Sequence, residues 1–212
     1  MADMLEAAGI DTVIRAGRSS TLRVDIADEN SIADAAQQLS QTGIAPDLII
    51  VATGLLHREG EGPEKSLREV DPEWMLENYR INAVGPVLVA KHFLPLMPRD
   101  RRTVFAVLSA RVGSISDNKL GGWHSYRASK AALNMLICNL SIEWQRKNAQ
   151  AVIVGLHPGT VATGLSAPFK GNPATERFAP AKAADQLLRV LDGLNPEQSG
   201  QLFGFDGALI AP

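Results

Sequence analysis

A run of five apolar residues, 48–52 (LIIVA), constrains the fold of this chain more than any other feature. A strand made entirely of apolar residues is covered on both faces, which is typical of a parallel sheet. Two further apolar strands are expected at 103–109 and 151–156, and amphipathic helices at 28–39 and 181–191. This alternation predicts a single α/β domain over residues 1–212, with a doubly wound, Rossmann-like, mostly parallel sheet and helices on both faces.

The remaining segments complete the predicted order of elements. We expect a helix that ends at Gly9, two short strands, an interrupted helix, a long helix and a last strand: 1–8, 11–16, 22–26, 71–97, 125–147 and 201–205. Two stretches show no periodicity. Residues 55–70 are expected to form a solvated connection, and residues 164–178 fit either a substrate lid or plain disorder.

Composition narrows the function classes. The chain has 212 residues, 45% of them hydrophobic, and a net charge of −2. That balance gives no basic surface for nucleic acid or an anionic membrane, and no apolar run approaches the ~20 residues that span a bilayer. The single cysteine, Cys138, lies in an apolar helical stretch and indicates a reducing compartment. With no signal peptide at 1–9, we expect a cytoplasmic protein without metal.

Tyr126 and Lys130 are the first candidates for chemistry. Four residues apart on a predicted helix, they share one face, about one turn from each other. An ammonium beside a phenol favours the phenolate, so we expect Lys130 to pull the pKa of Tyr126 from ~10 towards neutral. Tyr126 would then be an acid or base for a carbonyl or alcohol oxygen. Taken alone, the same spacing is usual for a surface pair with a half-packed tyrosine.

Pro86 lies inside the helix predicted over 71–97. Proline has no N–H to give to the carbonyl of Asn82, four residues earlier, and its ring crowds that carbonyl. The helix must therefore bend, which leaves the Asn82 carbonyl open to another donor. An ordered water there could pass protons to Lys130, or the bend could simply fit the helix to the sheet.

Two helices are apolar on more than one face, at 83–96 and 131–142. A helix that lies on a sheet needs one apolar stripe. The surplus predicts a second packing partner, namely a homodimer or homotetramer built through these helices about a dyad.

Together, these motifs resemble the short-chain dehydrogenase/reductase family. The resemblance consists of Asn82 in the bent helix, Ser109 at a strand end, the Tyr126-x-x-x-Lys130 helix and the 158–163 run (PGTVAT). Within the family it is greatest for the C-factor-like and sniffer-type carbonyl reductase branch, through Gly113-Ser114-Ile115, Asn118 and Gly121-Gly122 before the tyrosine. It covers nearly the whole chain.

The resemblance implies a hydride transfer between NADP(H) or NAD(H) and a small carbonyl or alcohol. Tyr126 would move the proton, Lys130 would hold the nicotinamide ribose and tune the phenol, and Asn82 would hold a relay water. The other implied cofactor contacts are Arg18, Asp25, Ile26, Ala52, Thr53, Gly54, Pro158, Gly159, Val161 and Thr163. A basic residue at Arg18 can receive a 2′-phosphate, so we favour NADP(H) over NAD(H), with a plain surface arginine as the alternative.

The chain departs from the family pattern at its start. The family opens with a strand and a Gly-rich turn that place the pyrophosphate on a helix N-terminus, whereas this sequence begins inside the helix that should follow. The strands at 11–16 and 22–26 would then have no neighbour linking them to 48–52. A truncated or misplaced start is the favoured explanation, and loss of cofactor binding is the alternative.

A second departure concerns the family's substrate-binding serine. The expected Ser-Ser pair reads Ser109-Ala110, and Ser109 should point to the opposite side of the strand. Ser114 could substitute from the following loop, but the sequence does not place it. Loss of one such donor commonly costs ~10²–10³ in rate. The alternatives to an active enzyme are therefore a catalytically weak or silent nucleotide-sensing or cell–cell signalling protein, and a structural partner that binds no nucleotide.

Overall fold

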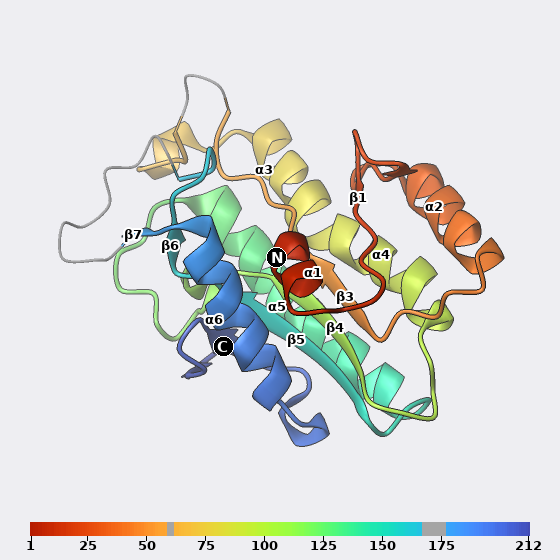
Figure 1. The fold of residues 1–212 in the computed structure, drawn as a ribbon. Helices are drawn as coiled ribbons and strands as arrows, with labels where there is room; N and C mark the ends of the chain where they lie inside the picture. The colour runs from red at the N-terminus through yellow and green to blue at the C-terminus, as the bar shows by residue number, and fades with distance from the viewer. Residues whose placement is uncertain (59–61, 167–176) are drawn as a thin grey trace.

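Five strands form the central sheet of this computed structural model, which describes residues 1–58, 62–166 and 177–212 (Figure 1). Their order is β3-β4-β5-β8-β9, and all neighbours are parallel except β8 and β9. The bounds are β3 (Leu48–Val51), β4 (Thr103–Leu108), β5 (Ala151–His157), β8 (Leu202–Gly204) and β9 (Leu209–Ile210). The predicted doubly wound, mostly parallel α/β fold is confirmed, while the antiparallel strand β9 was not predicted.

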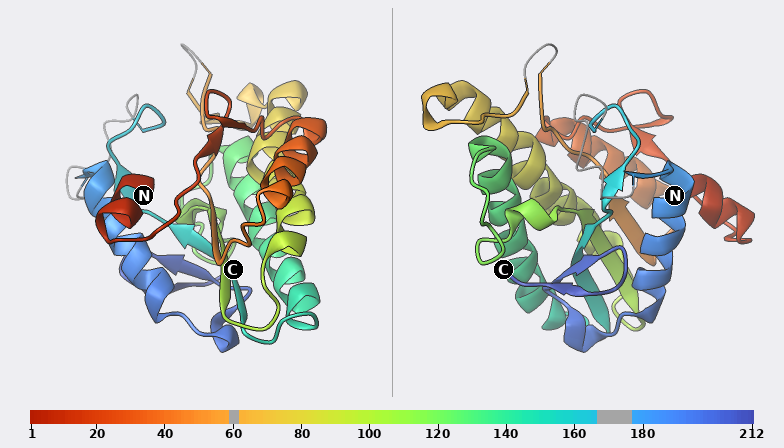
Figure 2. Two further views of the ribbon diagram at one scale, coloured as in Figure 1. Left: turned by 45° about the vertical axis from the view of Figure 1, so that its right-hand side comes forward. Right: turned by 90° about the vertical axis from the view of Figure 1, so that its left-hand side faces the viewer.

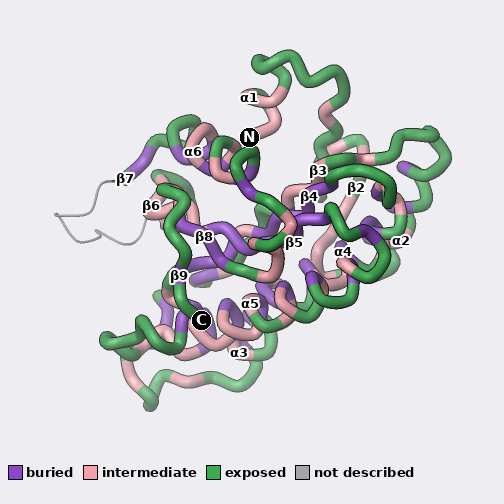
Figure 3. The backbone as a smooth tube through the Cα atoms, turned by 90° about the horizontal axis from the view of Figure 1, so that it is seen from below, coloured by how far each residue is buried: buried purple, intermediate pink, exposed green. Residues whose placement is uncertain are grey.

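Helices cover both faces of this sheet. On one face lie α2 (Glu29–Gln41), α4 (Gly85–Phe93) and α5 (His124–Gln145), and on the other α6 (Pro180–Gly193), with α1 (Ala2–Ala7) beside α6 (Figure 2). Alternate residues of β4 pack on opposite faces of the sheet, because successive side chains of a strand point in opposite directions. Phe105 and Val107 pack under α4 and α5, whereas Val104 and Ala106 pack under α6. Buried positions accordingly gather along the inner strands between these helices (Figure 3).

The N-terminal strands stand apart from the central sheet. β1 (Ala16–Gly17) and β2 (Leu22–Arg23) form a separate two-stranded parallel sheet, so the strands predicted at 11–16 and 22–26 are wrong in extent. In the described part of the chain β3 pairs with β4 alone, and its other edge carries no strand. Most of the predicted strand residues therefore have no ladder to join, and residues 11–15 are not in a strand.

The helix predicted over 71–97 is interrupted before Pro86. It consists of α3 (Pro72–Tyr79), a π-helical turn (Arg80–Val84), α4 and a short 3-10 turn (Leu94–Leu96). The Gly85 N–H donates to the Arg80 carbonyl five residues earlier, and this wider turn accommodates a proline that cannot donate. Such turns are frequent at functional sites. Asn82 lies buried in the middle of this one.

Two predicted loops differ from expectation. Residues 55–70 are not a fully solvated connection, because Leu56 and Glu64 are buried and Leu67–Glu69 forms a 3-10 turn. A polar loop residue becomes buried where a partner satisfies it, and Glu64 finds that partner on α5. Of the proposed lid at 164–178, residues 167–176 lie outside the described residues. Its last two, Arg177–Phe178, form β7, which pairs with β6 (Thr160–Val161).

Candidate active site

The first turn of α5 is fixed by a residue from a distant loop. The Glu64 carboxylate, 4% exposed, accepts from both the N–H and the hydroxyl of Ser125, and the Trp123 N–H donates to the Glu64 carbonyl at 2.5 Å. Three successive residues with positive φ, Gly121, Gly122 and Trp123, lead into the helix. An acidic residue 61 positions upstream gives no sequence signal of this role.

Tyr126 and Lys130 lie together at the carboxyl end of β4. Tyr126 is 7% exposed and Lys130 2% exposed, and the Lys130 Nζ lies 5.8 Å from the centroid of the phenol ring. The Nζ donates to the Leu108 carbonyl, the last of β4, at 2.8 Å. The predicted proximity on one helical face is therefore present, and the alternative of an exposed surface pair is excluded by burial.

The pKa values of the two groups differ from the prediction. Burial raises the pKa of Tyr126 to about 12 and lowers the pKa of Lys130 to about 8. The expectation that Lys130 pulls the pKa of Tyr126 towards neutral is wrong for these side chains as they stand. Removal from water penalises the charged form of both groups, and the ammonium bonds to a carbonyl rather than to the phenol oxygen.

Asn82 connects three elements through its side chain. Its amide group exchanges hydrogen bonds with both the N–H and the carbonyl of Leu55, each at 2.8 Å, and donates to Ser129 Oγ at 3.0 Å. Ser129 Oγ in turn donates to the Tyr126 carbonyl. A Cβ added at Gly54 would lie 3.8 Å from Asn82 Oδ1 and 4.0 Å from Lys130 Nζ. The structure thus brings Gly54, Asn82 and Lys130 together.

The ring of Tyr126 belongs to an apolar cluster. The other members are Leu56, Ala110, Val112 and Trp123, whose ring meets the phenol edge-on at 6.4 Å between centroids. This set includes the position where the family has its second serine, and a methyl group stands there. The sequence pattern gives no sign of Leu56, because this residue lies in a stretch without periodicity.

Neither nearby serine replaces the missing hydroxyl. Ser109 donates to Asn134 Oδ1 at 2.6 Å, away from the Tyr126 cluster, as strand alternation predicts. Ser114 is buried, but its hydroxyl meets Asp117 and the C-terminal Pro212 rather than any member of that cluster.

Four of the other candidate residues line the same edge of the sheet. Ala52 and Thr53 follow β3, and Pro158 and Gly159 follow β5, so parallel pairing brings them to the carboxyl edge where Lys130 meets β4. Gly159 has φ +72, and a Cβ there would lie 2.8 Å from the Phe178 ring.

The remaining candidates are scattered more widely. Val161 pairs with Phe178, and the Thr163 N–H donates to the Val161 carbonyl at 2.9 Å. Ile26 presses against α4, since a Cβ at Gly85 would lie 2.5 Å from its side chain. The Asp25 carboxylate accepts from the Ala27 N–H, and Arg18 is exposed just after β1.

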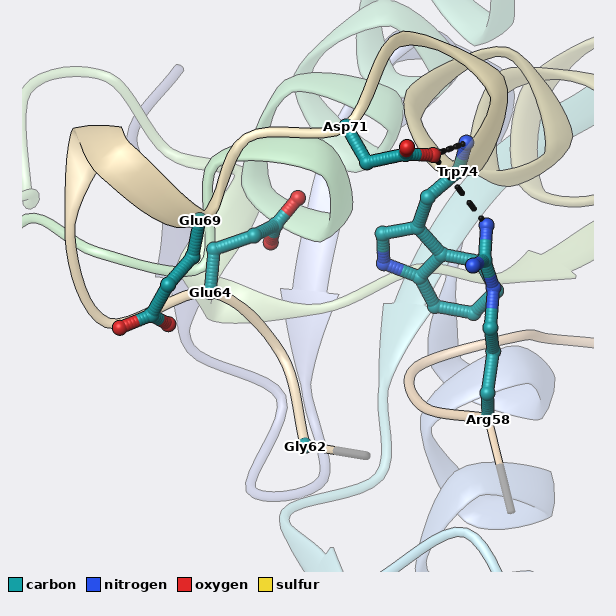
Figure 4. A pocket seen from close by; sticks show the side chains of 6 residues that line it. All are labelled: Arg58, Gly62, Glu64, Glu69, Asp71 and Trp74. Carbon is teal, nitrogen blue, oxygen red and sulfur yellow. Dashed lines mark hydrogen bonds and ion pairs between the residues drawn. The ribbon is translucent and has the colours of Figure 1, made fainter. Parts of the chain in front are cut away.

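Two hollows flank this region. One, of about 280 Å³, is lined by Arg58, Gly62, Glu64, Glu69, Asp71 and Trp74. Figure 4 shows the Arg58 guanidinium beside the Trp74 ring, 4.5 Å from its centroid, reaching Asp71. The other, of about 290 Å³, lies between the 112–118 loop and the start of α5. Neither has Tyr126 or Lys130 among its lining residues.

The described ranges (1–58, 62–166 and 177–212) hold no helix with the length and apolar character of a membrane span. Nor do they contain a group of three or more His, Cys, Asp or Glu side chains arranged to hold a metal ion.

A parallel α/β sheet with a buried tyrosine and lysine one helical turn apart at its carboxyl edge is the arrangement that the resemblance to dehydrogenases implies. A family model described as enoyl-(acyl carrier protein) reductase matches residues 2–190. The chain belongs to the short-chain dehydrogenase/reductase family and is an NAD(P)-dependent oxidoreductase of that type.

Individual relatives agree with this assignment. A dehydrogenase of 1-hydroxy-2-glutathionyl-2-methyl-3-butene from Rhodococcus is 30% identical over 187 residues, 88% of this chain and 77% of that protein. The C-signal protein of Myxococcus xanthus is 37% identical over 142 residues, 67% of this chain and 81% of that protein.

Solved structures give the same fold. NADPH-bound carbonyl reductase from chicken fatty liver has a TM-score of 0.78 at 25% identity, covering 99% of this chain and 81% of that one. The carbonyl reductase Sniffer of D. melanogaster has a TM-score of 0.76 at 22% identity, covering 90% and 77%. The predicted likeness to the C-factor-like branch is therefore supported by the C-signal protein, and the Sniffer structure agrees with the predicted fold.

Replacing Lys130 with methionine tests the state of the buried ammonium. With its pKa lowered to about 8, folded Lys130 binds its proton less tightly than the unfolded chain does at ~10.4. The penalty for burying the charge is fully present below pH ~8 and disappears as the pH rises towards ~10.4. The unfolding free energy of the parent relative to Lys130→Met should therefore rise by about 2–3 kcal/mol between pH ~7 and ~10, measured by urea denaturation.

The matched control is Lys119→Met, which removes an exposed lysine. An equal pH dependence of the stability difference in both variants would contradict the buried-ammonium account.

Proposed function

We propose that the protein is an NADP(H)-dependent carbonyl reductase acting on a small, fairly apolar aldehyde or ketone. The observation that carries the proposal is the buried Tyr126–Lys130 pair beside the apolar cluster of Leu56, Ala110, Val112 and Trp123. A cluster with these members favours an apolar substituent on the carbonyl carbon. The solved neighbours include an NADPH-bound carbonyl reductase and a short-chain dehydrogenase/reductase from Burkholderia multivorans with bound NADP.

The residues around Lys130 fit the ribose of a nicotinamide nucleotide. An ammonium has three N–H groups, and within the described chain Leu108 is the one acceptor that Lys130 has. A buried donor needs partners, so two N–H groups suit the hydroxyls of a ribose beside Gly54. The bound nicotinamide would supply the hydride. Gly54 is suited to a close approach of the ligand because it lacks a side chain.

Tyr126 is suited to donating a proton. Because burial raises the pKa of its phenol to about 12, the O–H is retained at neutral pH and is available to a developing alkoxide. The proton would be replaced through Lys130 from a water held at the Asn82 carbonyl, which Pro86 cannot engage because it lacks an N–H. A phenol that keeps its proton at neutral pH favours carbonyl reduction, in which Tyr126 donates a proton, over alcohol oxidation, in which it would accept one.

Tyr126→Phe removes the proposed proton donor and little else. We expect kcat for NADPH-dependent carbonyl reduction to fall by ~10²–10⁴, with the affinity for NADPH retained. The measurement is NADPH oxidation over a panel of carbonyl compounds, with calorimetry for the nucleotide. Tyr79→Phe, at the chain's only other tyrosine, is the control. Turnover of Tyr126→Phe at the parent rate would contradict the role of Tyr126 as proton donor.

Arg18 is the proposed receptor of the NADP(H) 2′-phosphate, and its exposed place after β1 leaves it accessible. Arg18→Ala should raise the KM for NADPH about tenfold, because a charge-assisted bond to phosphate is lost, and leave the KM for NADH unchanged. Arg23→Ala, an exposed arginine on the adjacent strand, is the control. Equal effects on both nucleotides would refute the assignment.

We also propose that the protein, cytoplasmic in location, forms a homodimer or homotetramer through the helices at 83–96 and 131–142. Met135 and Ile142, seven residues apart on α5, are 63% and 51% exposed, and Val84 on the π turn is 47% exposed. α5 packs beside that π turn and α4, so these side chains can contribute to one continuous surface. Exposed apolar patches of this kind mark protein interfaces.

Met135→Glu with Ile142→Glu should convert the oligomer to monomers, because burying two carboxylates opposes association. Sedimentation equilibrium measures the mass of the particle. Leu67→Glu, at an exposed leucine outside these helices, is the control. A monomeric parent, or an unchanged mass in the double variant, would contradict this interface.

A nucleotide-sensing or signalling protein is the second candidate. It is favoured by the methyl group at Ala110, where the family serine is absent, and by the likeness to the C-signal protein. The same assay separates the two, since binding of NADPH without turnover of any carbonyl would support sensing.

A further inference from the structure

The C-terminal residues reach the loop that lies over Tyr126 and Lys130. The Pro212 carbonyl accepts from the Ser116 N–H at 3.1 Å, the Ser116 hydroxyl at 2.7 Å and, at the longest distance, the Ser114 hydroxyl at 3.5 Å. Two of the three donors are side chains, and all belong to the loop that follows β4. One acceptor thus joins positions 96 and 98 residues apart.

The segment that carries this acceptor is itself anchored to the sheet. Leu209 and Ile210 form β9, which pairs with β8, and Ile210 is buried. β8 pairs with β5 in the middle of the sheet. The Pro212 carbonyl is therefore held at a defined place by contacts that do not involve β4 or α5.

The loop held by Pro212 forms one wall of the active site. Val112 packs against the cluster around Tyr126, and a Cβ added at Gly113 would lie 2.8 Å from both the carbonyl carbon and the Cβ of Lys130. Ser114 is 1% exposed, and its hydroxyl accepts from the Asp117 N–H at 3.1 Å. A shift of Ser114 or Ser116 would be transmitted within two to four residues to Val112.

We propose that residues 209–212 are a clasp that positions the 112–116 wall against Tyr126, with Ser116 and Ser114 as positioning residues for the carbonyl substrate. The inference rests on the proposed reductase function for its kinetic part. Its structural part does not depend on catalysis. The hydrogen bonds of Ser116 are exposed, so their loss should displace the loop without unfolding the protein.

Removal of Ala211 and Pro212 eliminates the shared acceptor and keeps Ile210. We expect amide exchange at Ser116 to accelerate about tenfold, while exchange at Phe105 in β4 is unchanged. The KM for the carbonyl substrate should rise about threefold or more, with the KM for NADPH and the unfolding midpoint unaltered. Ser116→Ala should show the same trend more weakly, and Ser116→Thr should restore the parent values.

The control is Ser40→Ala, which removes a similar 2.7 Å bond from an exposed serine hydroxyl to a carbonyl on α2. Unchanged exchange at Ser116 in the truncated form would overturn the clasp, whatever the activity. Faster exchange with unchanged kinetics, or a parallel rise in both KM values with a lower unfolding midpoint, would overturn the positioning role. A parent that reduces no carbonyl refutes the proposed function, while the exchange result still decides whether the clasp exists.

Discussion

Burial of the Lys130 ammonium is the constraint on which the active-site region depends. An ammonium withdrawn from water is expensive unless polar groups surround it, and the Leu108 carbonyl at 2.8 Å is the partner that the described chain supplies. That bond ties the second turn of α5 to the carboxyl end of β4. The side chain can reach this carbonyl only if α5 lies over the sheet in one register, which simultaneously places Tyr126 beside the apolar cluster.

Other contacts hold α5 in that register from different directions. Glu64 fixes its first turn, and the Asn82 amide engages Ser129 one residue before the lysine. Gly113 admits the backbone of Lys130 so closely that any side chain there would collide with it. Each contact comes from a different loop or helix. The position of the phenol is therefore determined by the tertiary structure as a whole and not by the helix that carries it.

The sequence predicted those features that depend on local periodicity and missed those that depend on burial. The apolar run at 48–52 and the Tyr126–Lys130 spacing carry a period, so both the sheet and the proximity of the pair could be anticipated. Pro86 predicted an interruption of the helix, because its lack of an N–H can be read from the residue itself. Glu64 and Leu56 gave no such signal, since their burial is created by partners far along the chain. The pKa of Tyr126 was mispredicted for the same reason: spacing gives the neighbour of a group, whereas burial decides which charge state is stable.

In the proposed reductase, the absence of a hydroxyl at Ala110 changes how the site would orient a carbonyl. With Ser109 bonded to Asn134 and Ser114 bonded within its own loop, the phenol is left as the hydroxyl beside the apolar cluster. A single donor fixes the distance of a carbonyl oxygen but leaves rotation about the hydrogen bond free. The remaining orientation must then come from the shape of the apolar walls, above all Val112 and Trp123. The placement of the 112–116 wall, and hence the contacts that hold it from behind, should therefore influence the carbonyl substrate more than the nucleotide.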